Sequence, residues 1–585
     1  YSLCVTLFEL FTGRKPFVSS DPLELIHSHI AKTPPDPCGV NAELSPMLGK
    51  IILKLLEKNA ENRYQSALGV EHDLTEVLRQ YRETGAVADF AVGQHDHSDR
   101  FLIPSKLYGR DTDVSKLVDA FQRVRDGQMV LSLVSGYSGV GKSSLVQELY
   151  RPLAAARGRY ITGKYDQYQR DVPYSAMAYA FNGLCDQILA ESAEGLAAWK
   201  HRILQAVGNN GQVLIELMPN IENVIGPQPP IPAVDPQAAK NRFNQVLVSF
   251  VSEICTPDEP LVLFLDDLQW IDQASLELLK LMLLDALPGL HLVGAYRDNE
   301  VEASHPLTLM LNAVTSAGRS YDVVHLGNLS PHNISELVCD TLALPKSEVR
   351  DLVGIICRKT QGNAFFATEF FKNLHARGLL TYSAERWRWD TQEIEDENIT
   401  ENVVDFMAAK LRDFGDNTQR ALKFAACIGN EFDLQTLSII LESATTMREI
   451  LDYLHPAING GGIRARSDEY KRVGIVDVSG DSVVFKFQHD RVQQAAYSLI
   501  PIDDRPRIHL QIGRLLNEDA QRRGNFEERL FEIVSHLNQA LPVVDNADER
   551  LSIAEVNHQA GAKALDAAAY KASTEYFSQA ERLLP

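Results

Sequence analysis

The fold is decided by the stretch MVLSLVSGYSGVGKSS, residues 129–144. It combines an apolar run, a glycine-rich turn and the start of a helix, and its core, Gly136-x4-Gly141-Lys142-Ser143, is the P-loop pattern. Glycines let backbone N–H groups point at a phosphate, and the positive end of the helix dipole adds to this. The lysine would reach the β- and γ-phosphates, and the serine hydroxyl would hold Mg²⁺. A glycine-rich turn between a core strand and a core helix is the alternative. We expect nucleotide contacts from the loop: Gly136, Ser138, Gly139, Val140, Gly141, Lys142, Ser143 and Ser144.

A second motif, PLVLFLDDLQWIDQAS at residues 260–275, agrees with the first. The apolar run 261–265 is typical of a parallel strand buried on both faces. Asp266 and Asp267 follow at its carboxyl end, where open α/β sheets bind their ligands. This is the Walker B pattern, in which Asp266 would hold Mg²⁺ through water and Asp267 would orient or deprotonate the attacking water. Capping of the next helix is the alternative role for both aspartates.

A third strand is expected in HLVGAYRDNEV, residues 291–301. Arg297 falls just past its end, where ATPases that this region resembles carry a polar residue that senses the γ-phosphate. A surface arginine is the alternative. Strands and helices alternate through this part of the chain, which predicts a parallel sheet covered by helices on both faces. No NKxD guanine-specificity motif is present in the sequence, so ATP is favoured over GTP.

Composition limits the classes of function. The 585 residues suggest three to five domains. A formal net charge of −21 argues against a nucleic-acid-binding surface. Seven scattered cysteines without a CxxC pair favour a reducing cytosol, hence a cytoplasmic location. No apolar run approaches the roughly 18 residues that a membrane helix needs. Because the chain begins at Tyr1 and ends at Pro585 within a helical pattern, we expect it to be a fragment of a longer polypeptide.

The first 80 residues resemble the end of a eukaryotic-type protein kinase C-lobe. The resemblance rests on YSLCVTLFELFTGRKPF, with Cys4 where the family usually has glycine, and on ENRYQSA, in which Arg63 would pair with a glutamate upstream of this chain. The Gly-rich loop with its strand lysine, the HRD loop and the APE motif are absent from the sequence, and we interpret the string at 413–415, DFG, as coincidence. Kinase chemistry is therefore not expected of this chain.

The remaining segments extend this order of parts. Residues 81–103 lack helical period and are interpreted as a linker, whose His95 and His97 we assign to a solvated loop rather than a metal site. Later segments predict a β-hairpin at 379–390, then helices with a second hairpin in the order of a winged helix, then alanine-rich helical pairs like the start of tetratricopeptide repeats. The expected boundaries are 1–80, 81–103, 104–327, 328–398, 399–504 and 505–585.

Taken together, GYSGVGKSSLVQEL, LVLFLDDLQWID, KTQGNAFF and KFQHDRVQQAAYSLIP resemble hybrid signalling proteins of bacteria and fungi. In these, a serine/threonine-kinase-like domain precedes an AAA/STAND-type ATPase, a helical region, a GAF sensor and a histidine kinase of two-component systems. The resemblance implies a multidomain α/β plus α fold: a parallel-sheet P-loop NTPase core, a winged-helix region, an all-α kinase C-lobe remnant and a helical-repeat tail.

The resemblance also implies further site residues. A hydrophobic-Gly-Arg-acid motif before the P-loop would seat adenine through Gly109 and Arg110, with Asp111 in place of the usual glutamate. The GNPFF motif appears with Ala364 in place of its proline, which puts the usual base contact in doubt, although Gly362 would still permit close approach.

The winged-helix region carries one more motif of this class. In STAND ATPases, a hydrophobic-His-Asp motif contacts the ADP phosphates and holds the closed state, and His489 matches it, except that the preceding Gln488 is polar. The alternative is that Asp490 caps the following helix with His489 beside it.

These observations lead to three functional hypotheses. The first is an ATP-binding, slowly hydrolysing regulatory switch with ATP/ADP and Mg²⁺ as cofactors; its partners are the GAF and histidine kinase domains of the same polypeptide, and a homo-oligomer is compatible with it. The second is the scaffold region of an active kinase whose catalytic motifs lie outside this chain. The third is a DNA-binding ATPase that uses the winged helix, against which the acidic charge counts.

Overall fold

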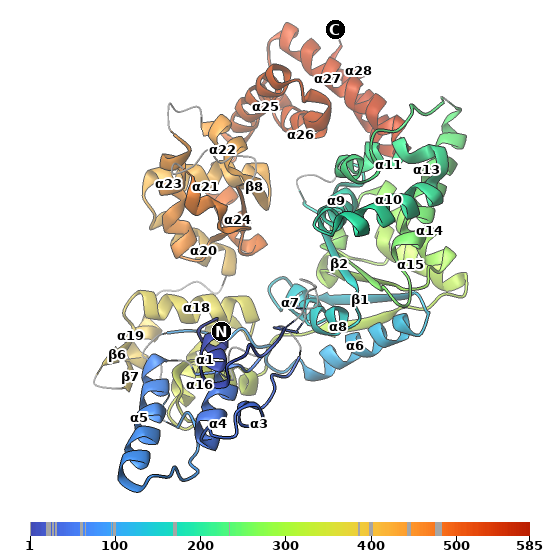
Figure 1. Cartoon of the computed structure of the whole chain (residues 1–585). Helices are drawn as coiled ribbons and strands as arrows, with labels where there is room; N and C mark the ends of the chain where they lie inside the picture. Colours follow the sequence, from blue (N-terminus) through green and yellow to red (C-terminus); the bar gives the residue numbers. More distant parts are fainter. Residues whose placement is uncertain are drawn as a thin grey trace. The chain divides into compact units, whose positions relative to one another are not determined.

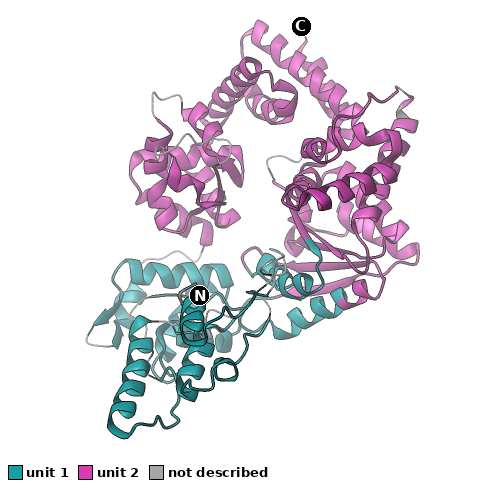
Figure 2. Ribbon diagram, viewed as in Figure 1, with its two compact units in different colours: residues 1–121, 140–159, 327–398 teal, residues 122–139, 160–326, 399–585 magenta. Residues whose placement is uncertain are grey.

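The computed structural model (Figure 1) describes residues 2–18, 25, 28–29, 32–58, 63–64, 66–94, 96, 101–167, 172–232, 234–383, 386–396, 402–441, 446–473 and 483–584. The chain forms two compact units (Figure 2): unit 1 comprises 1–121, 140–159 and 327–398, and unit 2 comprises 122–139, 160–326 and 399–585. Among the described helices, none is both long enough and apolar enough to span a bilayer. His95 and His97 lie outside the described residues.

A five-stranded sheet in the order β2-β3-β4-β1-β5 forms the centre of unit 2. The pairs β1–β4, β1–β5 and β3–β4 are parallel, and β1 is buried along its whole length. The strands expected before the P-loop, at 261–265 and in 291–301 are confirmed as β1 Val130–Gly136, β3 Leu261–Asp266 and β4 Leu290–Tyr296; β2 Arg159–Lys164 and β5 Asp322–Leu326 complete the sheet. Because parallel strands end at the same edge, Gly136, Lys164, Asp266 and the residue after β4, Arg297, are delivered to one side of the sheet.

Helices connect these strands, as the alternating pattern predicted. One long helix of this region is α13, whose N-cap Asp235 accepts a hydrogen bond from the Ala238 N–H at 3.0 Å. The α-helices of this region are α6 Asp111–Arg125, α9 Ser175–Leu189, α10 Ala193–Val207, α11 Gly211–Leu217, α12 Glu222–Ile225, α13 Pro236–Ile254, α14 Gln273–Asp285 and α15 Pro306–Ser316.

The next part of unit 2 combines helices with a small antiparallel sheet of order β8-β10-β9. The sheet packs on stacked rings, with Phe432 at 5.9 Å from Phe485 and 5.6 Å from Phe487 between centroids. The second predicted hairpin is confirmed by β9–β10 pairing, and residues 413–415 form the turn between α20 and α21. The elements are α20 Val403–Arg412, α21 Asp416–Ile428, β8 Glu431–Asp433, α22 Leu434–Leu441, α23 Met447–Asn459, β9 Ile463–Ala465, β10 Val484–Phe487 and α24 Asp490–Ser498.

Two helical pairs follow: α25 Arg505–Arg523 with α26 Phe526–Gln539, and α27 Ala547–Asp566 with α28 Tyr570–Leu583. Small residues permit the close approach, because a Cβ at Gly513 would lie 2.7 Å from the Leu537 side chain and one at Gly561 would lie 2.8 Å from the Phe577 ring. The consecutive pairing is what the alanine-rich pattern predicted.

The first helical pair also buries two histidines. His509 of α25 and His536 of α26 face each other with their Nδ1 atoms 2.9 Å apart and their rings stacked at 5.1 Å. The Tyr497 hydroxyl lies 3.2 Å from Nε2 of His509. Burial lowers the pKa of His509 to about 3, assisted by His536 and Arg505, and lowers the pKa of His536 to about 4, assisted by Arg529. Both imidazoles are therefore neutral at pH 7.

Unit 1 begins with the helices α1 Ser2–Thr12, α3 Pro37–Val40, α4 Pro46–Leu55 and α5 Ala67–Thr84. Its core includes a cluster of Met47, Ile51 and Val77, and Val87, Phe90 and Val92 pack against this cluster. These last three residues belong to the segment that was predicted to be a linker, so part of that segment contributes to the core. Arg63 donates to the main-chain carbonyls of Glu57 (2.6 Å) and Lys58 (3.0 Å).

Residues from later in the chain complete unit 1. The predicted hairpin is confirmed by antiparallel β6–β7 pairing, and Phe101 packs against the rings of Phe371, His375 and Trp387. Gly362 has φ +75°, and a Cβ there would lie 2.3 Å from the Leu329 carbonyl oxygen, so only glycine fits. The elements are α7 Lys142–Gln147, α8 Tyr150–Ala155, α16 Pro331–Leu342, α17 Arg350–Thr360, α18 Ala364–Ala376, β6 Leu380–Ser383, β7 Arg386–Trp389 and α19 Thr391–Asp396.

Candidate nucleotide-binding site

The P-loop has the backbone conformation that its glycines predict. It starts at Gly136, the last residue of β1, and Gly139 and Gly141 have φ values of 85° and 101°, which side chains with a Cβ rarely adopt. Lys142 is the first residue of α7 and is 8% exposed. The loop residues Ser138, Val140, Ser143 and Ser144 follow the same path from strand to helix. The conformation fits the phosphate cradle that the motif predicts.

Arg110, in the segment before the P-loop, binds main-chain carbonyl groups in the P-loop and directly after β5. The Arg110 guanidinium donates to the carbonyls of Val140 (3.2 Å) and Gly327 (2.5 Å), and Arg110 is 9% exposed. Burial lowers its pKa, which Asp113 opposes. Gly109 has φ +64°, and a Cβ there would meet the Asn333 amide at 2.4 Å. Both residues of this motif are therefore needed for the local packing, whatever further contact they make.

Replacing Arg110 with alanine is expected to lower the free energy of unfolding by about 3 kcal/mol, because two carbonyls lose a charged donor. Urea unfolding measures the loss. Arg319→Ala is the matched control, since Arg319 also donates to a main-chain carbonyl, that of Leu284 at 2.7 Å, but is exposed. Equal losses for the two variants would contradict the bracing role of Arg110.

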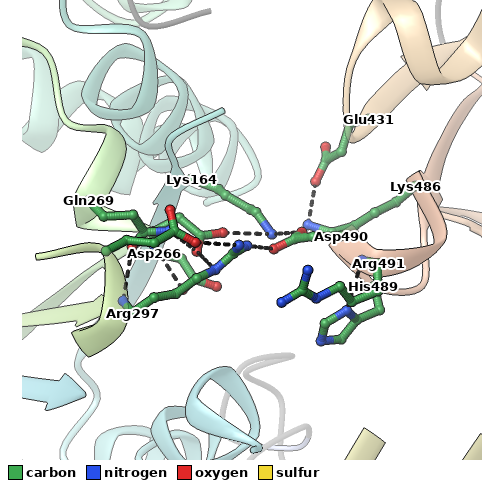
Figure 3. A network of polar contacts seen from close by, with 11 residues as sticks. Lys164, Asp266, Gln269, Arg297, Glu431, Lys486, His489, Asp490 and Arg491 are labelled. Carbon is green, nitrogen blue, oxygen red and sulfur yellow. Dashed lines mark hydrogen bonds and ion pairs between the residues drawn. The ribbon is translucent and has the colours of Figure 1, made fainter. Parts of the chain in front are cut away.

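The carboxylate of Asp267 belongs to a polar network in unit 2, and Figure 3 labels its partners Lys164, Gln269 and Arg297. Its Oδ1 accepts from Gln269 Nε2 at 2.7 Å and faces Arg297 Nε at 3.3 Å, while its Oδ2 lies 3.2 Å from Lys164 Nζ. Asp267 has left-handed backbone angles, φ 57° and ψ 46°, which cost free energy for a residue with a Cβ. Strain of this kind is concentrated at functional sites, in agreement with the predicted role of Asp267.

A second carboxylate reaches the same two cations from the small C-terminal sheet and helix region. Asp490, the first residue of α24, forms a hydrogen-bonded ion pair with Lys164 through Oδ1, and its Oδ2 lies 2.9 Å from Arg297 NH2. The Asp490 side chain is 13% exposed and that of Arg297 is 3% exposed. Figure 3 shows Asp490 facing Lys164 and Arg297. One end of α24 is thus joined electrostatically to the carboxyl edge of the parallel sheet.

Arg297, the candidate γ-phosphate sensor, uses all of its guanidinium nitrogens in these contacts. Besides Asp267 and Asp490, it pairs with Glu300 at 3.0 Å, and its guanidinium lies 4.5 Å from the Trp270 ring centroid. Its backbone N–H donates to Gln269 Oε1 at 3.1 Å. In this arrangement, Arg297 is held by protein carboxylates.

The charges of the network shift one another's pKa values. Burial raises the pKa of Asp267, and Asp490 and Asp266 add to this, while Lys164 and Arg297 oppose it. Burial also opposes ionisation of Asp490, but Lys164, His489 and Arg297 outweigh it and hold its pKa well below the usual range. Asp490 is therefore ionised and forms ion pairs with both Lys164 and Arg297.

His489 precedes this carboxylate and is the N-cap of α24. Its Nδ1 accepts from the Arg491 N–H at 3.1 Å, so the cap is His489 itself and not Asp490, as one interpretation of the sequence had it. Burial lowers the pKa of His489 to about 4, against the opposing charge of Asp490. A neutral imidazole accepts the capping hydrogen bond through one nitrogen.

No sequence pattern identified Lys164 or Gln269 as members of this site, or Asp490 as the partner of Lys164 and Arg297. Lys164 carried a usable signal, since it ends a strand of the parallel sheet in GRYITGKYDQYQ, where ligand-binding residues gather. Gln269 lies two residues after the Walker B pair, and no sequence rule assigns such a position.

Comparison with known proteins identifies an ATPase domain model over this region. Residues 106–293 match the family model described as AAA ATPase domain. The chain is 29% identical to "Hybrid signal transduction histidine kinase G" of Dictyostelium discoideum, over 100% of this chain and 20% of that protein. It is 38% identical over 77 residues to "Serine/threonine-protein kinase PknB" of Mycolicibacterium smegmatis, which covers 13% of this chain and 12% of that kinase. The chain thus spans about a fifth or less of the length of these relatives.

Among solved structures, the chain is similar to that of a Signal Transduction ATPase with Numerous Domains (STAND) protein with a tetratricopeptide repeat sensor from Pyrococcus horikoshii. The similarity has a TM-score of 0.41 and 11% identity, and it covers 83% of this chain and 59% of that one. At this TM-score, the likeness supports no conclusion about the present chain.

Proposed function

We propose that this chain is the ATP-binding, slowly hydrolysing regulatory switch of a multidomain signal-transduction kinase. The P-loop geometry and the AAA ATPase domain match support nucleotide binding, and the histidine kinase relatives support a place in signalling. Lys142 would contact the β- and γ-phosphates, Ser143 and Asp266 would hold Mg²⁺, and Gly109 and Arg110 would border the adenine.

The observation that carries the switch proposal is the shared use of Arg297 by Asp267 and Asp490. Each guanidinium nitrogen of Arg297 already contacts a carboxylate, so a γ-phosphate that binds Arg297 would compete with the Asp490 contact. ADP lacks that phosphate and leaves the contact intact, with His489 beside it. ATP and ADP would then have different affinities for the open and closed states, which is the condition for a ligand to shift a conformational equilibrium.

The relatives also guide the proposed setting. We assign the first 80 residues to a kinase C-lobe remnant, 399–504 to a winged-helix-like region and 505–585 to tetratricopeptide-like repeats. GAF and histidine kinase domains of the same polypeptide are the proposed partners, in the cytoplasm. Kinase catalysis would reside outside this chain, as the scaffold hypothesis also holds, and the net charge of −21 disfavours nucleic acid as a partner.

The test is the affinity of the purified chain for each nucleotide by isothermal calorimetry. Asp490→Asn keeps the shape of the side chain but removes the charge that holds Lys164 and Arg297. We expect it to weaken ADP binding about tenfold, in line with typical coupling free energies, while ATP binding stays the same or becomes tighter because ATP no longer competes with Asp490 for Arg297. Asp416→Asn is the matched control, because Asp416 also opens a helix but is exposed. An equal effect on ADP and ATP would contradict the switch.

A further inference from the structure

Lys164 connects the two carboxylates on which the proposed switch depends. We infer that Lys164 is an inhibitory positioning residue: in the closed arrangement, its ammonium occupies Asp267 and thereby withholds this carboxylate from the hydrolytic water. The inference rests on the proposed function, and it adds that closure suppresses hydrolysis through a cation of the ATPase core itself.

The backbone places Lys164 so that this contact forms without strain. Lys164 is the last residue of β2, which neighbours β3 in the sheet, and β3 ends at Asp266. The next residue, Tyr165, donates its N–H to the Asp266 carbonyl at 3.1 Å, which fixes the start of the side chain relative to the Walker B pair. From this position, Lys164 Nζ reaches Asp267 Oδ2 at 3.2 Å.

The contacts of Asp267 explain why an ammonium there is inhibitory. A water-activating carboxylate must offer an accessible oxygen to the water. Asp267 Oδ1 already accepts from Gln269 and faces Arg297, so Oδ2 is the oxygen that could serve water, and Lys164 lies against it. The side chain of Asp267 is 4% exposed. With Lys164 in place, its ammonium blocks the approach of water to this oxygen.

Asp490 makes the inhibition conditional on closure. Lys164 is 24% exposed, and its flexible side chain is held between Asp267 and Asp490, which come from different parts of unit 2. When Asp490 withdraws, Lys164 keeps one anionic partner and regains access to solvent, so its hold on Asp267 weakens. Nucleotide that opens the switch would then also restore hydrolysis.

Steady-state ATP hydrolysis at saturating Mg·ATP tests the inference. Lys164→Met removes the charge and keeps the length of the side chain. We expect kcat to rise about tenfold while KM stays within about twofold of the wild type. This rise is a fraction of the roughly 100- to 10,000-fold rate acceleration that a general base can contribute. Asp490→Asn should raise kcat similarly, and the double variant should show no further increase, because both substitutions release the same carboxylate. Lys164→Arg, which keeps the charge, should stay near the wild type.

Lys240→Met is the matched control, because Lys240 is 27% exposed and also forms an ion pair, at 2.5 Å with Glu277, outside the network. It should leave kcat unchanged. A fall in kcat in Lys164→Met would show that Lys164 instead assists the transition state, and an unchanged kcat would show that it does not restrain Asp267; either result overturns the inference.

The calorimetric affinities measured in parallel separate this inference from the proposed function. Loss of nucleotide binding by the wild type would overturn the proposed function, whereas intact binding with the wrong change in kcat would overturn only the role of Lys164. Should Lys164→Met fail to fold, Lys164→Gln and Asp490→Asn test the same release of Asp267.

Discussion

Lys142→Ala is expected to weaken binding of both Mg·ATP and Mg·ADP by at least about 100-fold. The lysine is buried at the start of α7, directly after the left-handed Gly141, so its charge is held at the loop that would cradle the phosphates. Hydrogen bonds to charged groups contribute about 1.5–3 kcal/mol each, and removing two of them corresponds to a loss of 100-fold or more. Unlike Asp490→Asn, this variant should not distinguish ADP from ATP.

Calorimetry with each nucleotide measures this loss, and thermal unfolding without nucleotide checks that the variant folds. Lys116→Ala is a suitable control, since Lys116 lies on the exposed surface of α6 with a side chain 54% exposed. Affinity within threefold of the wild type in Lys142→Ala would mean that the P-loop is a structural turn.

Acidification from pH 7.5 to 5 should lower the free energy of unfolding by up to about 4 kcal/mol through His509 and His536 alone. Their pKa values in the folded chain, about 3 and about 4, lie below the ordinary value of 6.5, so the unfolded chain binds more protons in this range. Their contribution to stability is complete above pH 6.5 and is lost as the pH falls toward the folded values. Each histidine accounts for about 2 kcal/mol at pH 5.

The charged surroundings reinforce this sign. Arg505 lowers the pKa of His509 and Arg529 lowers that of His536, because both arginines are like charges to a protonated imidazole. Urea unfolding at several pH values measures the loss.

The double variant His509→Gln/His536→Gln keeps polar side chains that do not titrate, and its stability should depend less on pH by the predicted amount. His332→Gln, at a histidine whose side chain is 66% exposed, should leave the pH dependence unchanged. A double variant with the same pH dependence as the wild type would refute the prediction.

The parallel sheet and the positions at its edge could be predicted from sequence, because the signals are local. An apolar run followed by Gly136 or by Asp266 predicts both the strand and the residue at which it ends, within a few positions of sequence. The contacts of Asp490 could not be predicted in this way. Its partners Lys164 and Arg297 lie 326 and 193 residues earlier in the chain, and no periodicity or spacing reports a pairing across such a distance.

The segment after α5 shows a different limit. Its lack of helical period predicted a linker, yet Val87, Phe90 and Val92 pack on the core of unit 1. An irregular backbone can still bury apolar side chains wherever the neighbouring helices leave a surface for them, and sequence period reports only regular structure.

The short helix α24 has a mechanical consequence. It is nine residues long, it begins at Asp490, and the Tyr497 hydroxyl near its other end contacts His509 of α25. At 1.5 Å per residue, these two attachment points are about 10 Å apart along a rod too short to bend. We therefore expect a displacement of Asp490 to move Tyr497 as well, so that α24 would couple the edge of the parallel sheet to the helices of the C-terminal tail.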